Sequence, residues 1–229
     1  VLYGGGLAIG VVMLFLAATG LIDWLAKFIP KSVVRGIQFG LGLQLAMLAL
    51  TDYVPSDGRP GFVLALVAFV LTLCLLGNRR FPPAPFIILL GIGYAFAFRL
   101  DASTLVQGIA LHLPQVHRPA WQDVLTGFVV LALPQLPLSL GNSILATRQI
   151  VHDLFPQRPV TVRKISFTYS LMNLVNPFFG GVPTCHGSGG MAGHHAFGGR
   201  TGGSIVIYGS IYLTLGLFFS QSFQAVIQL

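Results

Sequence analysis

A glycine-rich stretch at residues 179–203, FGGVPTCHGSGGMAGHHAFGGRTGG, interrupts an otherwise apolar part of the chain. Pro183 and the two glycines before it disfavour a helix, so a short helix is predicted to begin between Cys185 and Ser188. The first N–H groups of a helix have no intrahelical acceptor and lie at the positive end of its dipole. The glycines after His186 would leave those groups open to a ligand, which is typical of an oxyanion site at a helix N-terminus.

A second stretch at residues 132–149, ALPQLPLSLGNSILATRQ, combines two prolines with several polar side chains. The prolines leave carbonyl groups without helical partners, and Ser139, Asn142 and Ser143 share one face of a helix. Inside a bilayer, a broken helix survives only where it is buried in protein or lines a water-filled cavity. Close helix packing through small residues is the alternative interpretation of both stretches.

The two stretches together supply the predicted substrate-binding residues, which offer backbone N–H, hydroxyl, amide and imidazole groups. They are Gln135, Ser139, Asn142, Thr184, Cys185, His186, Gly187, Ser188 and Gly189. Charged residues such as Asp23 and Asp123 stand at the ends of apolar runs rather than in their middles. Because a cation carrier usually needs a buried carboxylate, this pattern favours an anion or a neutral polar molecule as the ligand.

Two other chemistries would use the same residues. Cys185 and His186 could be metal ligands together with His194 and His195, but these pairs are adjacent or at least eight residues apart, unlike common zinc spacings. The run HGSGG resembles a hydrolase nucleophile elbow in which His186 replaces the first glycine. No catalytic residue, metal or cofactor is therefore predicted, and the protein is not expected to be an enzyme. An intramembrane metal-dependent enzyme stays open as an alternative.

The composition indicates an all-α integral membrane protein. Of the 229 residues, 54% are hydrophobic and 8% are charged, whereas soluble domains carry about 25% charged residues. A membrane-spanning helix needs roughly 20 apolar residues. Such runs are predicted at 4–22, 33–50, 61–76, 86–98, 124–150, 165–179 and 204–219, with 104–116 as a loop or surface helix.

The basic residues orient these spans. They outnumber the acidic residues, all Asp, by 13 to 6, and they lie between the apolar runs rather than in one patch, so no nucleic-acid partner is expected. Placing the end of the first run in the cytoplasm satisfies the positive-inside rule in a multi-pass protein of the plasma (inner) membrane. The cytoplasmic set is Lys27, Lys31, Arg35, Arg79, Arg80, Arg148, Arg158, Arg163, Lys164 and Arg200, and the outer set is Arg59, Arg99 and Arg118.

Four segments resemble the molybdate transporter family, a relative of the sulfate permeases. They are IPKSVVRGIQFGLGL (29–43), LPQLPLSLGNSILAT (133–147), DLFP (153–156) and SLMNLVNPFFGGVPTCHGSGGMAGHHAFGGRTGGS (170–204). The run P-x-C-H-G-x-G-G-x-A-G within the last segment is the most specific. Sulfate permeases carry an arginine where this chain has Gly189, Gly190 and Met191, which favours the molybdate branch.

The resemblance implies a fold of two inverted seven-helix repeats, divided into core and gate domains, with half-helices at the substrate site. It implies core helices at 1–30 and 124–222, including the broken helix, and gate helices at 31–100. Residues 101–123 would form an extracellular loop, and 223–229 would begin a further, truncated helix.

The function implied by the resemblance is secondary transport of an oxyanion, molybdate in the first place, by alternating access. The expected partners are that oxyanion and the lipid bilayer, and a homodimer is left open. Sulfate, or inorganic anions in general, is the close alternative substrate. A scaffold without transport activity is a further alternative, and no residue pattern identifies a coupling ion.

Overall fold

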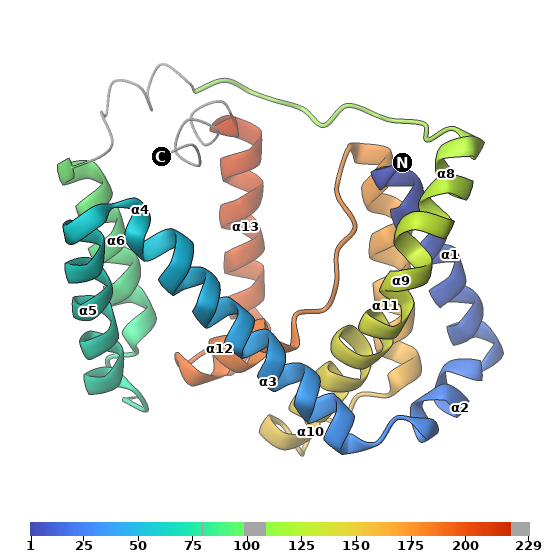
Figure 1. The fold of residues 1–229 in the computed structure, drawn as a ribbon, viewed down its shortest axis with the longest axis horizontal. Helices are drawn as coiled ribbons and strands as arrows, with labels where there is room; N and C mark the ends of the chain where they lie inside the picture. Colours follow the sequence, from blue (N-terminus) through green and yellow to red (C-terminus); the bar gives the residue numbers. More distant parts are fainter. Residues whose placement is uncertain (79, 99–108, 221–229) are drawn as a thin grey trace. The chain divides into compact units, whose positions relative to one another are not determined.

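Helices make up all the regular structure in the residues that the computed structural model describes, 1–78, 80–98 and 109–220 (Figure 1). Within these ranges, four helices are long and apolar enough to cross a membrane: Leu2–Thr19, Ser32–Ser56, Gly58–Leu75 and Trp121–Leu154. Two shorter apolar helices are Pro83–Phe98 and Gly203–Phe218. The prediction of an all-helical membrane protein is confirmed.

The chain divides into two compact units, each described here by itself. The first unit comprises Val1–Leu45 and Pro114–Ala192, and the second comprises Ala46–Leu113 and Gly193–Leu229. All nine predicted substrate-binding residues belong to the first unit. The core and gate boundaries implied by the family resemblance stay a prediction.

The first unit is built on α1, α11 and the long helical rod that begins with α8. Its elements are α1 (Leu2–Thr19), α2 (Leu21–Phe28), the first part of α3 (Lys31–Leu48), α8 (Trp121–Gly127), η2 (Phe128–Ala132), α9 (Leu133–Leu138), η3 (Ser139–Ala146), α10 (Thr147–Leu154), α11 (Val162–Val175), η4 (Asn176–Phe179) and the start of α12 (Ser188–Ala196). Its core includes Ile9, Met13, Ile144, Ile165 and Tyr169, all nearly inaccessible to solvent.

Glycine lets α1 and α8 approach to backbone contact. A Cβ atom built on Gly127 would lie 2.2 Å from the backbone nitrogen of Gly5, and one on Gly4 would lie 2.1 Å from the carbonyl oxygen of Asp123. Membrane helices associate through such small residues, because lipid provides no hydrophobic force that drives them together. This close contact fixes the rod against α1.

The two prolines of residues 132–149 do not break the helix, so the prediction of a break there is wrong. The rod runs without interruption from α8 to α10 (Figure 1), and it widens into π-helical turns at η2 and η3. At the first of these, the N–H of Leu133 bonds to the carbonyl of Phe128, five residues back. A wide turn re-pairs backbone groups near a proline, and π-helical turns are frequent at functional sites.

The first predicted span, 4–22, ends earlier than expected. Gly20 takes a left-handed conformation, with φ 77°, and it ends α1 at Thr19. Glycine adopts this conformation without steric cost. Leu21 and Ile22, the last residues of the predicted span, therefore belong to the following helix, α2. That helix buries Ile22 and exposes Trp24.

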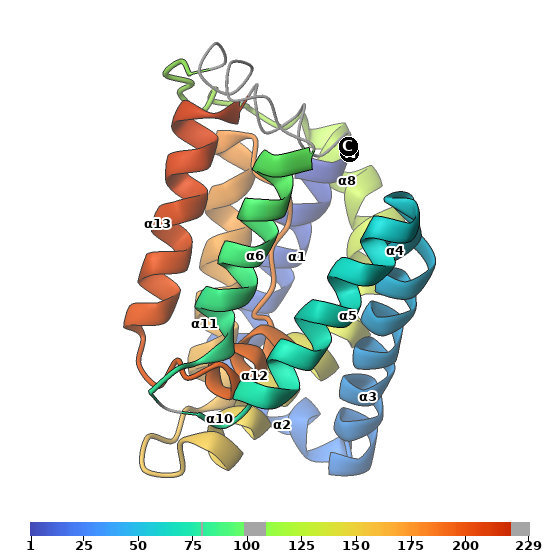
Figure 2. The same ribbon diagram turned by 90° about the vertical axis from the view of Figure 1, so that its left-hand side faces the viewer.

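The second unit contains the end of α3, the π-helical η1 (Ala49–Tyr53), α4 (Val54–Ser56), α5 (Gly58–Leu75), α6 (Pro83–Phe98) and α13 (Gly203–Phe218) (Figure 2). Residues 109–120 contain no regular element, and Ala110 and His112 donate backbone hydrogen bonds to Phe218 and Leu217 at the end of α13. The parts of the predictions that fall on residues 79, 99–108 and 221–229, Arg79 and Arg99 included, lie outside the described residues.

Candidate functional site

The start of α12 is the centre of the candidate site. An extended segment, residues 181–187, precedes it, and α12 begins at Ser188, the last residue of the predicted starting range. Ser188 is 2% exposed. By contrast, a Cβ atom at Gly189 or Gly190 would meet no heavy atom within 4 Å. The glycines here are therefore not needed for close helix packing, and they leave open space beside the first turn.

Ser188 joins α12 to the rod. Its hydroxyl donates a hydrogen bond to Asn142 Oδ1 at 3.1 Å. Asn142 lies in η3 and is half-buried. The two polar stretches that the sequence singles out, 46 residues apart, therefore meet in one hydrogen bond.

Ser139, one turn earlier in η3, faces α11 instead. It is fully buried, and its hydroxyl lies 2.8 Å from the hydroxyl of Tyr169, with either group able to donate. Tyr169 is itself 2% exposed. This pair satisfies two polar groups between apolar helices, where an unpaired hydroxyl would be costly.

The extended segment before α12 lies along α11 and is bonded to it at two levels. Thr184 pairs through its backbone with the side chain of Asn173, and its hydroxyl accepts a hydrogen bond from Asn176 Nδ2 at 3.0 Å. Two residues further on, His186 Nε2 lies 2.8 Å from the Thr168 hydroxyl and 3.2 Å from the carbonyl oxygen of Ile165. The imidazole is thereby anchored on α11.

Gln135 and Cys185 take no part in the hydrogen bonds just described. Both side chains are exposed, Gln135 on α9 and Cys185 as a free thiol in the extended segment. Gly187 is also exposed, and its carbonyl accepts the hydrogen bond from the N–H of Met191 that opens the helix. The N–H groups of Ser188, Gly189 and Gly190 precede that first intrahelical bond.

Metal ligands do not gather in the described part of the chain. Among residues 1–78, 80–98 and 109–220, no three His, Cys, Asp or Glu side chains come together in a metal-binding group. His194 instead stacks edge-on against Tyr208 on α13, with ring centroids 5.7 Å apart. Both of these aromatic residues belong to the second unit.

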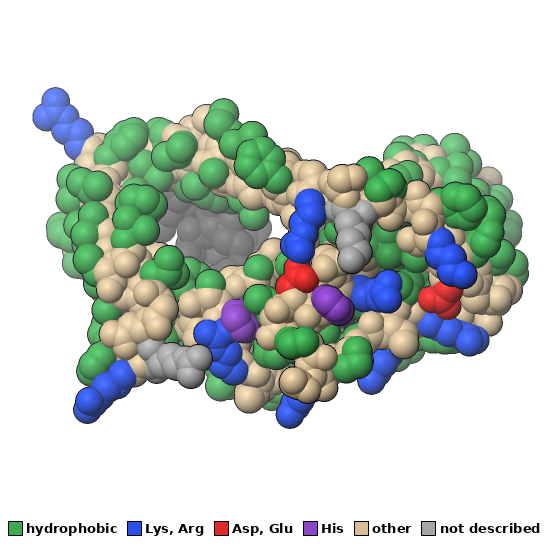
Figure 3. Space-filling model, turned by 90° about the horizontal axis from the view of Figure 1, so that it is seen from below, with side chains coloured by type: hydrophobic (Ala, Val, Ile, Leu, Met, Phe, Trp, Pro, Cys, Tyr) green, Lys and Arg blue, Asp and Glu red, His purple; other side chains and the backbone are tan. Residues whose placement is uncertain are grey.

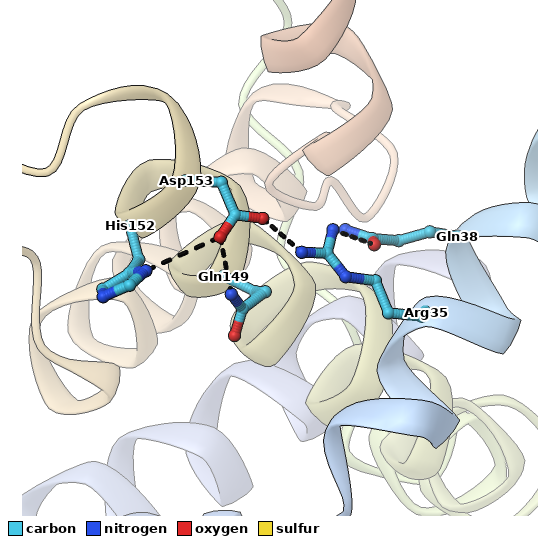
Figure 4. A network of polar contacts seen from close by, with 5 residues as sticks. All are labelled: Arg35, Gln38, Gln149, His152 and Asp153. Carbon is cyan, nitrogen blue, oxygen red and sulfur yellow. Dashed lines mark hydrogen bonds and ion pairs between the residues drawn. The ribbon is translucent and has the colours of Figure 1, made fainter.

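A separate polar network joins α3 to α10 within the first unit (Figure 4). Arg35 forms an ion pair with Asp153, and it also donates a hydrogen bond to Gln38 at 3.3 Å. Gln149 Nε2 donates to the other oxygen of Asp153 at 2.8 Å, and His152 Nδ1 lies 3.5 Å from that oxygen. The sequence places Arg35 among the cytoplasmic basic residues, but it gives no sign of this partner.

The face seen from below carries charged side chains among apolar ones (Figure 3). At the same end of α1 and α11, Arg163 Nη2 donates to the carbonyl of Ala18 at 2.9 Å. Arg163 and Ala18 belong to the predicted cytoplasmic side. The contact shows that α1 and α11 run antiparallel within the first unit, as the orientations predicted for the runs 4–22 and 165–179 require.

Asn173, Tyr169 and Thr168 are polar residues of α11 that contact the predicted site residues but stand outside the two polar stretches of the sequence. Their partners lie 11 to 30 residues away in the chain. The sequence carries one signal, at Asn173, because an asparagine within an apolar run is costly in a bilayer unless it is hydrogen-bonded.

The long apolar helices, with α1 and α8 packed through glycine and the start of α12 bonded to Asn142, define an integral membrane protein. Residues 1–45 and 127–229 match the model of the family described as molybdate transporter of MFS superfamily. The chain belongs to this family, and the resemblance read from its motifs is confirmed.

Individual relatives agree with the family match. Molybdate transporter 1 and molybdate transporter 2 of Arabidopsis thaliana are 32% and 31% identical over 269 aligned positions, which cover 97% of this chain and 58% and 57% of theirs. Molybdate transporter 1 of Chlamydomonas reinhardtii is 34% identical over 157 positions, covering 65% of this chain and 30% of its own. The chain thus spans less than three fifths of the length of these curated relatives.

Proposed function

We propose that the full-length protein is a secondary transporter, rather than an enzyme, and that it carries an oxyanion, molybdate in the first place, across a membrane. Its family membership and the names of its relatives support this function. The apolar helices support a location within the bilayer. Sulfate has the same charge and tetrahedral shape, so it is the competitor against which the substrate has to be tested.

The hydrogen bond between Ser188 and Asn142 is the observation that carries the proposed site. It brings a polar helix, η3, to the start of α12, where the glycines leave space. The dianion would lie in that space and accept hydrogen bonds from the N–H groups of Ser188, Gly189 and Gly190. Gly187 is among the predicted substrate-binding residues, but α12 begins at Ser188, so the backbone donors proposed here run from Ser188 to Gly190.

The hydroxyl groups near α12 already have partners, and this limits how they can bind an anion. Thr184 accepts a hydrogen bond through its oxygen and keeps its own hydrogen for an anion. Ser188 donates its hydrogen to Asn142. A half-turn of the Asn142 amide would point its NH₂ group at Ser188 and release the serine hydrogen toward the dianion. The Ser139 hydroxyl remains hydrogen-bonded to Tyr169. Ser139 would therefore affect anion binding by holding η3 against α11 rather than by contacting the anion.

The binding energy must offset the removal of a dianion from water. Hydrogen bonds to a charged acceptor contribute about 1.5–3 kcal/mol each, and the helix dipole adds a favourable field at the N-terminus. Three backbone donors and one or two hydroxyls therefore supply several kcal/mol. Backbone donors are fixed by the helix, so they require little reorganisation when the anion enters.

The architecture implied by the family resemblance completes the proposal. Two inverted seven-helix repeats would form core and gate domains, and movement of one against the other would expose the site to each side in turn. This chain would supply one half-helix of the site, α12, and the other half-helix would lie outside this chain. The homodimer and the plasma (inner) membrane location belong to the same proposal.

Uptake by the full-length protein in proteoliposomes tests the function. We expect saturable molybdate uptake that a several-fold excess of sulfate does not abolish, and loss of uptake in Ser188→Leu, whose larger side chain would replace the buried hydroxyl bonded to Asn142 and push the start of α12 away from η3. Ser210→Leu is the matched control, because Ser210 is exposed on α13. Equal inhibition by sulfate would change the substrate to oxyanions in general, and absence of uptake by a folded wild type would contradict transport.

A further inference from the structure

Asn173 is a polar residue in the middle of an apolar helix, and its side chain is 0% exposed. It is not among the residues that would bind the anion. The neighbouring extended segment, residues 181–187, raises a separate problem. Its backbone N–H and C=O groups cannot pair within a helix, and each unpaired group in a bilayer costs several kcal/mol.

The Asn173 side chain pairs both backbone groups of Thr184. Its Oδ1 accepts a hydrogen bond from the Thr184 N–H at 3.0 Å, and its Nδ2 donates to the Thr184 carbonyl at 2.8 Å. A paired residue of a neighbouring antiparallel strand makes the same two bonds. The second hydrogen of Nδ2 donates to the carbonyl of Tyr169 at 3.0 Å, which fixes the orientation of the amide.

We infer that Asn173 is a positioning residue for the oxyanion site, acting as a one-residue strand partner that sets the register of the segment leading into α12. The inference rests on the proposed function. Thr184 lies four residues before Ser188, and His186 between them is anchored on Thr168. Because an extended chain advances about 3.3 Å per residue, a slip of one residue at Thr184 would carry Ser188 away from Asn142.

Other buried polar residues of α11 do not have this role. Ser166 and Ser170 are also fully buried, but their hydroxyls donate to carbonyls of α11 itself, at Val162 and Ser166. Small hydroxyls of this kind commonly satisfy themselves within their own helix. Asn173 differs because two of its three hydrogen bonds leave the helix and hold another segment. Ser170→Ala is therefore the matched control for substitution of Asn173.

The test measures the extended segment directly and transport separately. Cys185 follows Thr184 and is exposed, so its rate of reaction with a water-soluble maleimide reports the conformation there. In the full-length protein, with Cys74 and all other cysteines replaced by alanine, Asn173→Leu should change that rate several-fold. It should also raise the KM for molybdate about tenfold, because Thr184 loses both backbone partners. Ser170→Ala should change neither quantity.

Asn173→Asp provides a second variant if the leucine variant does not fold. It keeps the acceptor for the Thr184 N–H but replaces the donor to the Thr184 carbonyl, and we expect an effect in the same direction. An unchanged Cys185 rate and an unchanged KM in a folded Asn173 variant would overturn the inference. A changed Cys185 rate in a protein whose wild type transports no oxyanion would support the positioning role and overturn the proposed function instead.

Discussion

At the scale of single residues, the polar side chains around the site are joined in pairs, and the backbone N–H groups at the start of α12 are the donors left for a ligand. Ser188 pairs with Asn142, Ser139 with Tyr169, and the backbone of Thr184 with Asn173. Each pair joins two elements that are distant in sequence. Each pair therefore contributes to the fold, and a substrate must be accommodated without leaving either member unpaired.

The Ser139–Tyr169 pair gives a prediction about stability. Ser139→Ala leaves a buried tyrosine hydroxyl without its partner, so thermal unfolding in detergent should show a loss of about 1–3 kcal/mol. Tyr169→Phe should show a similar loss. The double variant should cost clearly less than the sum of the two, because no unpaired hydroxyl remains. Strictly additive losses would contradict a direct bond between the two groups.

Thr147 provides the control for this argument. It is 5% exposed, and its hydroxyl oxygen has no hydrogen-bond partner among the described residues. Thr147→Val has nearly the same shape and removes a polar atom that gains nothing from burial. We expect unfolding at the same temperature as the wild type or slightly above it. A large loss of stability would show that the hydroxyl has a bound partner in the folded protein.

The sequence predicted some of these residues but not their pairs. Ser139, Asn142, Thr184 and Ser188 stand beside prolines and glycines, so local chemistry marks them. Asn173 stands in the apolar run SLMNLV, and from the sequence it could equally be a residue that forms a hydrogen bond between two packed helices. Its role depends on an extended segment that returns along α11, and no local pattern specifies that return.

At the scale of elements, glycine has two opposite uses in this chain. Gly127 allows backbone contact between α8 and α1, whereas Gly91 in α6 has open space at its Cβ position. The sequence alone cannot separate these uses, because both glycines lie in apolar helices. The difference is set by which helix face meets another helix.

Substitution by alanine tests the two glycines. Gly127→Ala places a methyl group 2.2 Å from the backbone nitrogen of Gly5, so α1 and α8 must separate. Overpacking of this kind typically costs about 1–3 kcal/mol, and backbone contact makes relief difficult. Gly91→Ala should be neutral or slightly stabilising, because alanine favours a helix. Equal melting temperatures for the two variants would contradict the packing of α1 on α8.

The ion pair between α3 and α10 should stabilise the fold only weakly. The side chains of Arg35 and Asp153 are 53% and 32% exposed, and exposed pairs typically contribute about 0.2–1 kcal/mol. A double-mutant cycle with Arg35→Gln and Asp153→Asn should give a coupling energy in that range. The coupling should fall in about 1 M salt, where the Debye length is about 3 Å. A larger coupling that resists salt would mean that lipid or protein shields the pair from water.

The rod from α8 to α10 shows where prediction from sequence fails at this scale. Two prolines within four residues predict a break, because each one removes a helical hydrogen bond. The structure retains the helix by widening its turns, so that the N–H of Leu133 reaches back five residues to Phe128. The break before α12 could be predicted, since two glycines and Pro183 leave few alternatives to an extended chain.

At the scale of the whole molecule, the predicted orientation can be tested within the first unit. Arg163 lies at the start of α11, and Arg118 lies next to His117, which bonds to Phe178 just beyond the other end of that helix. The helical residues between them span about 25 Å, close to the thickness of the hydrocarbon core. The two arginines should therefore face opposite sides of the membrane.

Single-cysteine labelling checks this orientation. In intact cells, a membrane-impermeant thiol reagent should label Arg118→Cys and should reach Arg163→Cys only after permeabilisation. Both side chains are exposed, so a difference between them reflects the membrane rather than burial. Labelling of Arg163→Cys from outside would reverse the orientation derived from the positive-inside rule.

The sequence was sufficient to identify an integral membrane protein, because the composition alone decides this. With 8% charged residues in 229, only a bilayer accommodates so much apolar surface. The nine site residues fall in one compact unit, which their two separate stretches did not require. The contacts that bring the stretches together are the Ser188–Asn142 hydrogen bond and the hydrogen bonds of Tyr169 and Asn173 on α11.

The most direct measurement is the location of a bound oxyanion in the full-length protein. Tungstate has the charge and shape of molybdate, and its anomalous X-ray scattering identifies it independently of the protein density. We predict a single strong peak within hydrogen-bonding distance of the N–H groups of Ser188, Gly189 and Gly190, facing η3, and absent in Ser188→Leu. A peak elsewhere in the membrane region, unaffected by Ser188→Leu, would contradict the proposed site.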